Sequence, residues 1–104
     1  MKYFISGIGT DVGKTVASAI LVQALKSDYW KPIQSGDLAN SDSQKVKELI
    51  SHSNCQFFGE TYRLNQPLSP HASAPLDGIE IELKKFELPK SENLIIEGAG
   101  GLLV

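Results

Sequence analysis

The segment Gly7 to Thr15 constrains the fold most, because it places glycines between a short apolar stretch and a long apolar run. Lys2 to Ser6 has the composition of a short strand, and Lys14 to Ser27 predicts a helix. Glycines let backbone amides converge on phosphate oxygens, and a helix N-terminus adds positive potential. The sequence Gly13-Lys14-Thr15 at the helix start therefore predicts a nucleotide-binding loop.

In such a loop, Lys14 is expected to bridge the β- and γ-phosphates, and Thr15 to place its hydroxyl on Mg²⁺. The standard spacing has a glycine five residues before Gly13, but Ile8 stands there and Gly7 lies one residue earlier. The loop is therefore one residue longer than usual. The alternative is a chance glycine-rich turn, which the strand–loop–helix context disfavours.

Further elements alternate along the chain as strands and helices. The helix 14–27 is apolar nearly all round, so we expect it to be largely buried. The pattern predicts an α/β fold, with a P-loop-type parallel sheet covered by helices. After that helix we expect a strand at 29–33, with Pro32 marking its end or a sheet edge. The later expected elements are a loop at 36–40, a helix at 41–53, a short strand at 62–64, a short helix (or a strand) within 79–88 and a strand at 94–96.

Three or four strands are visible, fewer than a doubly wound domain usually has, and the last motif lies close to Val104. We therefore expect residues 1–104 to be the N-terminal part of a single P-loop ATP-binding domain, truncated relative to a longer protein.

Composition narrows the kinds of partner and compartment that the chain can have. Ten basic and 12 acidic side chains give a net charge of −2, and the longest basic run is Lys84-Lys85, so nucleic acid is disfavoured. No apolar run approaches the length of a membrane span. Cys55 is the single cysteine, which leaves no internal disulfide and fits a reducing cytoplasm.

Polar residues follow two of the predicted strands. Glu97 ends the last strand and precedes a glycine-rich segment, where a carboxylate points into the ligand crevice of a parallel sheet. Mg²⁺ prefers such oxygen ligands, although a solvated charge is the alternative. Lys31 at the end of the second strand could reach the same crevice or be an ordinary surface lysine.

Two further segments carry weaker signals. Asp42 follows Ser41, which has capping-box spacing to Gln44; alone, Asp42 is better explained as compensating the helix dipole than as a metal ligand. Ser69 to Ala74 could open a short helix with free amides for an anion. His71 within it could equally be a surface histidine.

Together these motifs resemble, in order and over nearly the whole chain, those of dethiobiotin synthetases. The matching segments are Gly7 to Thr15, Lys31 to Gly36, Asn40-Ser41-Asp42, Ser69-Pro70-His71 and Glu97 to Gly101. The resemblance implies that diaminopelargonate, CO2 and ATP give dethiobiotin: an amine is carbamylated, ATP phosphorylates the carbamate, and the second amine closes the ring. Members of the family are homodimers about twice as long as this chain, so a homodimer is also expected of the full-length protein.

The resemblance also implies residue roles. Lys14, Thr10 and Lys31 are the catalytic candidates, and Ser35 contacts the substrate. Thr15, Asp42 and Glu97 hold the metal. The nucleotide contacts are Gly9, Thr10, Asp11, Val12, Gly13, Lys14 and Thr15.

This chain departs from the family pattern at Asp11, which stands where glutamate is frequent, and at Gly9, which replaces a more polar residue. A partition-type ATPase is the nearest competing interpretation, but such proteins carry an extra lysine where Gly9 stands. The motifs are also compatible with an amidoligase-type P-loop enzyme or with an inactive nucleotide-binding fragment.

Overall fold

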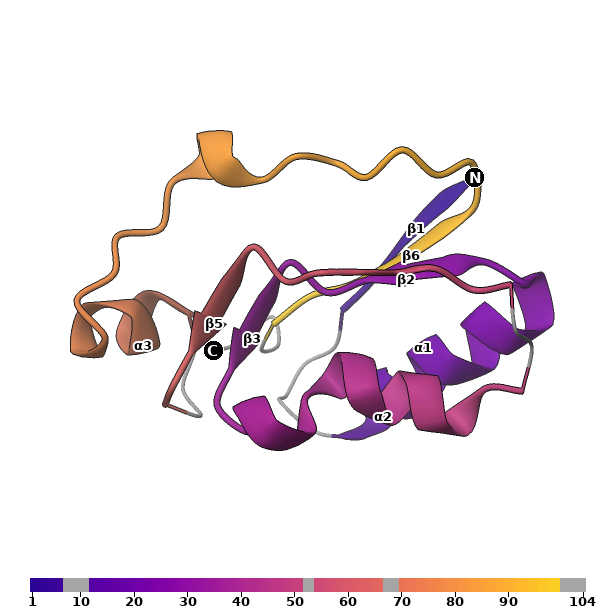
Figure 1. The fold of residues 1–104 in the computed structure, drawn as a ribbon, viewed down its shortest axis with the longest axis horizontal. Coiled ribbons are helices and arrows are strands. Elements are labelled where there is room, and N and C mark those ends of the chain that lie inside the picture. The colour runs from indigo at the N-terminus through magenta and orange to yellow at the C-terminus, as the bar shows by residue number, and fades with distance from the viewer. Residues whose placement is uncertain (7–11, 52–53, 67–69, 100–104) are drawn as a thin grey trace.

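The computed structural model describes residues 1–6, 12–51, 54–66 and 70–99 (Figure 1). The strands are β1 (Lys2–Ile5), β2 (Asp28–Trp30), β3 (Ile33–Ser35), β4 (Phe57–Phe58), β5 (Tyr62–Leu64) and β6 (Leu94–Glu97). The helices are α1 (Val12–Leu25), α2 (Asp42–Leu49) and α3 (Pro70–Leu76), with 3₁₀ turns at Leu38–Asn40 and Leu83–Lys85.

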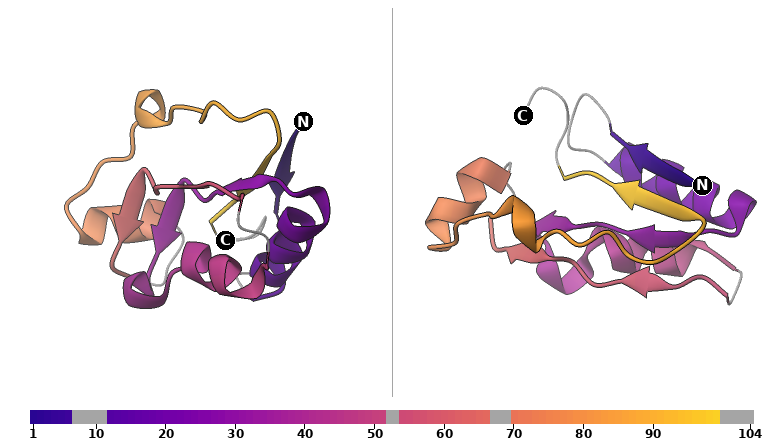
Figure 2. Two further views of the ribbon diagram at one scale, coloured as in Figure 1. Left: turned by 45° about the vertical axis from the view of Figure 1, so that its right-hand side comes forward. Right: turned by 90° about the horizontal axis from the view of Figure 1, so that it is seen from above.

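Within the described residues the strands form two parallel sheets. The larger, here called the site sheet, has the order β1-β6-β2-β4, and the smaller, here called the small sheet, pairs β3 with β5. In the right-hand view of Figure 2, β1, β6 and β2 lie side by side. The prediction of a parallel α/β sheet is confirmed.

The main core lies between the site sheet and the helices α1 and α2, which cover one of its faces (Figure 1). Its buried residues are Ala19, Val22, Tyr29, Val46 and Ile95. A second cluster beside the small sheet contains Tyr62, Leu64 and Ala74. Each sheet therefore packs against its own hydrophobic cluster.

The strand expected at 29–33 is interrupted, which corrects the prediction from sequence. β2 ends at Trp30, and β3 begins at Ile33 in the other sheet. Proline lacks an N–H to continue a ladder, while the Pro32 carbonyl accepts from the Thr61 and Tyr62 amides at 2.7 and 3.1 Å. The chain therefore changes sheets at Lys31-Pro32.

Three other elements differ from expectation. Helix α2 ends at Leu49, not 53, because Ile50 has extended backbone (φ −96°, ψ 155°). Between 79 and 88, where a helix was favoured, the helical part is a single 3₁₀ turn. The two-residue strand β4 was not predicted.

Helix α1 is not buried all round, so that expectation was wrong. Its buried positions follow helical spacing along one face, whereas Val16 and Ile20 are 45% and 62% exposed. The buried residues are Lys14, Thr15, Ser18, Ala19 and Val22. No helix in the described ranges has the length and apolar character needed to cross a membrane.

Candidate functional site

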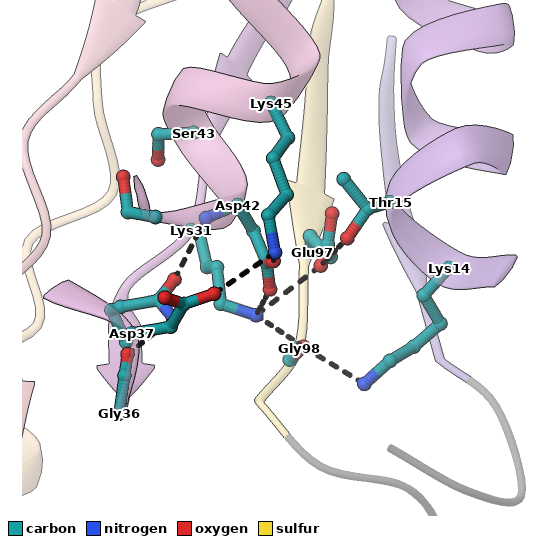
Figure 3. Close-up of polar contacts among 12 residues, drawn as sticks. Lys14, Thr15, Lys31, Gly36, Asp37, Asp42, Ser43, Lys45, Glu97 and Gly98 are labelled. Atoms are coloured by element: carbon teal, nitrogen blue, oxygen red, sulfur yellow. Dashed lines mark hydrogen bonds and ion pairs between the residues drawn. The ribbon is translucent and has the colours of Figure 1, made fainter. Parts of the chain in front are cut away.

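Polar side chains converge at the carboxyl-terminal edge of the site sheet (Figure 3). The register pairs Trp30 of β2 with Ile96 of β6, so Lys31 and Glu97 follow directly at neighbouring strand ends. Helix α1, which starts beside this edge, contributes Lys14 and Thr15. In open parallel sheets this edge is where ligands bind.

Glu97 is fully buried, at 0% exposed. Among the described residues its carboxylate accepts from the Thr15 hydroxyl at 3.3 Å, the Tyr29 hydroxyl at 2.9 Å and Lys31 Nζ at 3.2 Å. A buried carboxylate is costly unless donors and an opposite charge compensate its lost hydration. These contacts provide both, so Glu97 is not a solvated charge at a strand end.

Lys31 joins the two acidic residues of the site. It is 3% exposed, and its Nζ lies 2.8 Å from Asp42 Oδ2 and 3.2 Å from Glu97 Oε2. It also donates to the Gly98 carbonyl at 3.3 Å. Lys31 is therefore a buried cation at the edge of the site sheet and not an ordinary surface lysine.

Lys14, near the start of α1, contacts the same backbone carbonyl as Lys31. Lys14 is 8% exposed and donates to the Gly98 carbonyl at 3.1 Å, so the ammonium groups of Lys14 and Lys31 approach one carbonyl oxygen (Figure 3). This arrangement places two positive charges close together at the sheet edge. The carboxylates of Asp42 and Glu97 offset the charge of Lys31, and Lys14 stands where the lysine of a Gly-Lys-Thr helix start contacts nucleotide phosphates.

Asp42 opens helix α2, where Ser41 provides the predicted cap by accepting from the Gln44 amide at 3.4 Å. Burial would raise the pKa of the Asp42 carboxyl, but the hydrogen bond and charge of Lys31, helped by Lys45, hold that pKa below its ordinary value. Asp42 therefore does more than compensate a helix dipole, because it pairs with a lysine from another strand.

Two residues of this region were missed by sequence reasoning. Gln34 is buried and spans the loop to α2: its Oε1 accepts from the Asp42 amide at 3.1 Å, and its Nε2 donates to the Gly36 carbonyl at 2.9 Å. Gln34 thereby holds Asp42 in place. It lies inside the Lys31 to Gly36 segment, which was the available signal.

Tyr29 is the other missed residue. It is fully buried, and burial together with the nearby charge of Glu97 raises the pKa of its phenol, so the hydroxyl is a donor. Tyr29 stands two positions before Lys31 in the chain, and residues two apart on a strand share a face. That spacing alone could have suggested the shared location.

Some predicted residues lie outside the described part of the chain. These are Gly9, Thr10, Asp11, Ser69, Gly100 and Gly101. Helix α1 begins at Val12, two residues before the predicted start. Ser35 ends β3, and its buried hydroxyl has no hydrogen-bond partner among the described residues.

The donor set suits a hard cation. Across the described residues no group of three or more histidine, cysteine, aspartate and glutamate side chains could hold a metal. The site offers the Asp42 and Glu97 carboxylates with the Thr15 hydroxyl beside Glu97. Mg²⁺ commonly takes one or two carboxylates and completes its shell with waters and phosphates, so these residues fit it.

A parallel sheet, the Gly-Lys-Thr helix start and a carboxylate at the end of β6 together define a P-loop nucleotide-binding fold. The family model described as "AAA domain" matches residues 1–104. The chain belongs to this family.

Named relatives refine this assignment. The chain is 60% identical over 104 residues to the ATP-dependent dethiobiotin synthetase BioD of Christiangramia forsetii, covering 99% of this chain and 50% of the relative. A protein of the same name from Cytophaga hutchinsonii is 50% identical, covering 99% of this chain and 50% of the relative. Another from Chlamydia pneumoniae is 52% identical, covering 98% of this chain and 46% of the relative. The chain thus resembles dethiobiotin synthetases and spans about half the length of the curated relatives it matches.

Proposed function

We propose that this chain forms the ATP- and Mg²⁺-binding part of a dethiobiotin synthetase, which uses ATP to convert diaminopelargonate and CO2 to dethiobiotin. The observation that carries the proposal is the convergence of Lys14, Lys31 and Glu97 at one sheet edge, beside the Gly-Lys-Thr helix start. The similarity to relatives that bear this name supports it. A cytoplasmic homodimer is the expected form of the protein.

In this proposal the loop from Gly9 to Thr15 cradles the phosphates, and Lys14 neutralises charge on the β- and γ-phosphates. Thr15, Asp42 and Glu97 would hold Mg²⁺. When bound, the metal would neutralise charge that develops on the transferred phosphoryl group.

Lys31 has a separate role in the proposal. A carbamate is anionic, and so is the γ-phosphoryl group that its oxygen attacks, so the two repel each other. Positive charge from Lys31 and Lys14 lowers that repulsion, and Thr10 is proposed to take part in the same step. The buried hydroxyl of Ser35, at the end of β3, the next strand along the chain, is proposed to contact the diamine substrate.

Calorimetric titration of Mg·ATP tests the nucleotide site. Lys14→Ala removes a charged donor, which is worth about 1.5–3 kcal/mol and predicts affinity lower by about one to two orders of magnitude. Lys85→Ala is the matched control, since Lys85 is an exposed lysine paired with Glu82. Equal affinity in Lys14→Ala and the parent would contradict the assignment.

An ADP-release assay on the whole gene product tests the reaction. ADP release should require both diaminopelargonate and CO2, with bicarbonate restoring activity in CO2-depleted buffer. ATP hydrolysis that continues without diamine or CO2 would indicate a partition-type ATPase instead.

A further inference from the structure

The hydroxyl of Tyr29 makes the shortest of the three contacts described for Glu97. It donates to Oε1 at 2.9 Å, whereas Lys31 and Thr15 donate to Oε2 at 3.2 and 3.3 Å. Tyr29 and Glu97 are both 0% exposed, so water does not compete for this bond. The two oxygens of Glu97 therefore have separate surroundings, one on the core side and one on the site side.

Strand register explains why a tyrosine reaches this carboxylate. Tyr29 of β2 lies opposite Ile95 of β6, and Glu97 follows two residues later on the same face. Two strand residues span roughly 6.6 Å, a distance that the long phenol side chain bridges. The ring packs against Phe57, with centroids 5.5 Å apart, and belongs to the main core, which fixes the direction of its hydroxyl.

We propose that Tyr29 is a positioning residue of the nucleotide site: by holding Glu97 Oε1, it keeps Oε2 directed toward Thr15 and Lys31. The inference rests on the proposed function, because it takes Glu97 as a metal ligand. Outer-shell partners that orient metal ligands typically contribute 10- to 100-fold to metal affinity. A tyrosine that merely filled the core would contribute to folding and leave metal affinity unchanged.

Tyr62 provides a matched control in the small sheet. It is also buried, its ring packs against Phe86 at 5.4 Å, and its hydroxyl accepts from the Glu82 amide at 2.9 Å. Tyr29→Phe and Tyr62→Phe thus each remove one hydrogen-bonded hydroxyl from a buried tyrosine and keep the ring. The two variants differ in whether that hydroxyl contacts Glu97.

The experiment titrates Mn²⁺ by electron paramagnetic resonance, using the whole gene product with a non-hydrolysable ATP analogue. Tyr29→Phe should weaken Mn²⁺ binding by roughly 10- to 100-fold, while Tyr62→Phe should bind it as the parent does. Denaturant unfolding without metal is measured for both. Metal affinity that falls equally in both variants, in step with stability, would overturn the inference.

Glu97→Gln separates this inference from the proposed function. If Glu97→Gln binds Mn²⁺ like the parent, the proposed metal role fails and the inference with it. If Glu97→Gln binds weakly but Tyr29→Phe is normal, the inference alone is overturned. Removing the Tyr29 hydroxyl from Glu97→Gln should cost little further affinity, and a full additional loss would contradict action through Glu97.

A spectroscopic measurement keeps the native tyrosine and so does not depend on whether Tyr29→Phe folds. With ¹³Cζ-labelled tyrosine, the Tyr29 resonance should move in Glu97→Gln because its acceptor changes, while that of Tyr62 stays in place. An unmoved Tyr29 resonance would show that the hydroxyl does not contact Glu97 and would overturn the inference.

Discussion

The site sheet and the small sheet each bury a tyrosine, but the two hydroxyls have different kinds of partner. Tyr29 in the site sheet donates to the carboxylate of Glu97, whereas Tyr62 in the small sheet accepts from a backbone amide. The same contrast extends to other polar groups. Lys31 and Glu97 are buried against each other, while Ser73 and Asp77 near the small sheet bond to the backbone at Gln66 and Asn65.

This difference in partners suggests two kinds of polar group: those that stabilise the fold and those that are held in place for a ligand. Side chains bonded to backbone satisfy groups that any fold must satisfy. Buried charges are expensive, and replacing them with apolar residues is frequently neutral or stabilising. Their concentration at the carboxyl edge of the site sheet therefore favours a functional explanation, and paired substitutions in the two regions can test it.

Lysine substitutions should show the largest difference. Lys31→Gln leaves the buried Glu97 without its cation, which should lower unfolding stability by about 3–5 kcal/mol. Turnover should fall by roughly 10²–10³-fold, and ATP binding much less. Lys85→Gln removes an exposed pair with Glu82 and should cost at most about 0.5 kcal/mol. Denaturant unfolding with single-turnover kinetics checks both, and similar losses would remove the contrast.

Aspartate substitutions should distinguish a residue of the site from a residue that stabilises the fold alone. Asp42→Asn should cut turnover by roughly 10²–10³-fold if Asp42 has the proposed role, because it would remove a preorganised charge at the proposed phosphoryl-transfer centre. Its loss of stability should be about 1–3 kcal/mol, since the pair with Lys31 is lost. Asp77→Asn, which weakens the contacts to Asn65, should affect stability alone. An Asp42→Asn enzyme with full activity and a lower Tm would make Asp42 a structural residue.

Low pH should reduce the folding stability of the protein through Asp42. Its pKa is lower in the folded protein than in the unfolded chain, so its contribution to stability is present above the unfolded pKa of about 3.9. That contribution is lost as pH falls through the lower folded value. Unfolding free energies from pH 6 to pH 2 should therefore fall more for the parent than for Asp42→Asn. Parallel curves would show that the carboxyl is not stabilised by Lys31.

Local patterns predicted much of this molecule. Strands β1, β5 and β6, the start of α1 near Gly13 and the cap at Ser41 follow from composition and spacing over a few residues. The placement of Lys31 and Glu97 at one edge follows from the rule that parallel strand ends meet.

Features that depend on tertiary pairing could not be predicted. Pro32 indicated a strand end from the sequence, but the change to a second sheet depends on the bonds of its carbonyl to Thr61 and Tyr62, which are distant in sequence. The contact of Tyr29 with Glu97 needs the register of β2 on β6, which no local pattern contains. Likewise, the apolar pattern of α1 does not indicate which of its faces packs on the sheet.

Serine substitutions should give the smallest and most specific contrast, and both lie beside the small sheet, since Ser35 ends β3 and Ser73 lies in α3. The buried hydroxyl of Ser35 has no partner among the described residues, so Ser35→Ala should leave stability within about 0.5 kcal/mol. The Ser73 hydroxyl donates to the Gln66 carbonyl at 3.1 Å, so Ser73→Ala should cost about 1 kcal/mol. If the Ser35 hydroxyl contacts the diamine, Ser35→Ala should raise the KM for diaminopelargonate and leave that for ATP unchanged. Ser73→Ala should change neither KM, and an unchanged diamine KM in Ser35→Ala would leave the orphaned hydroxyl without a substrate role.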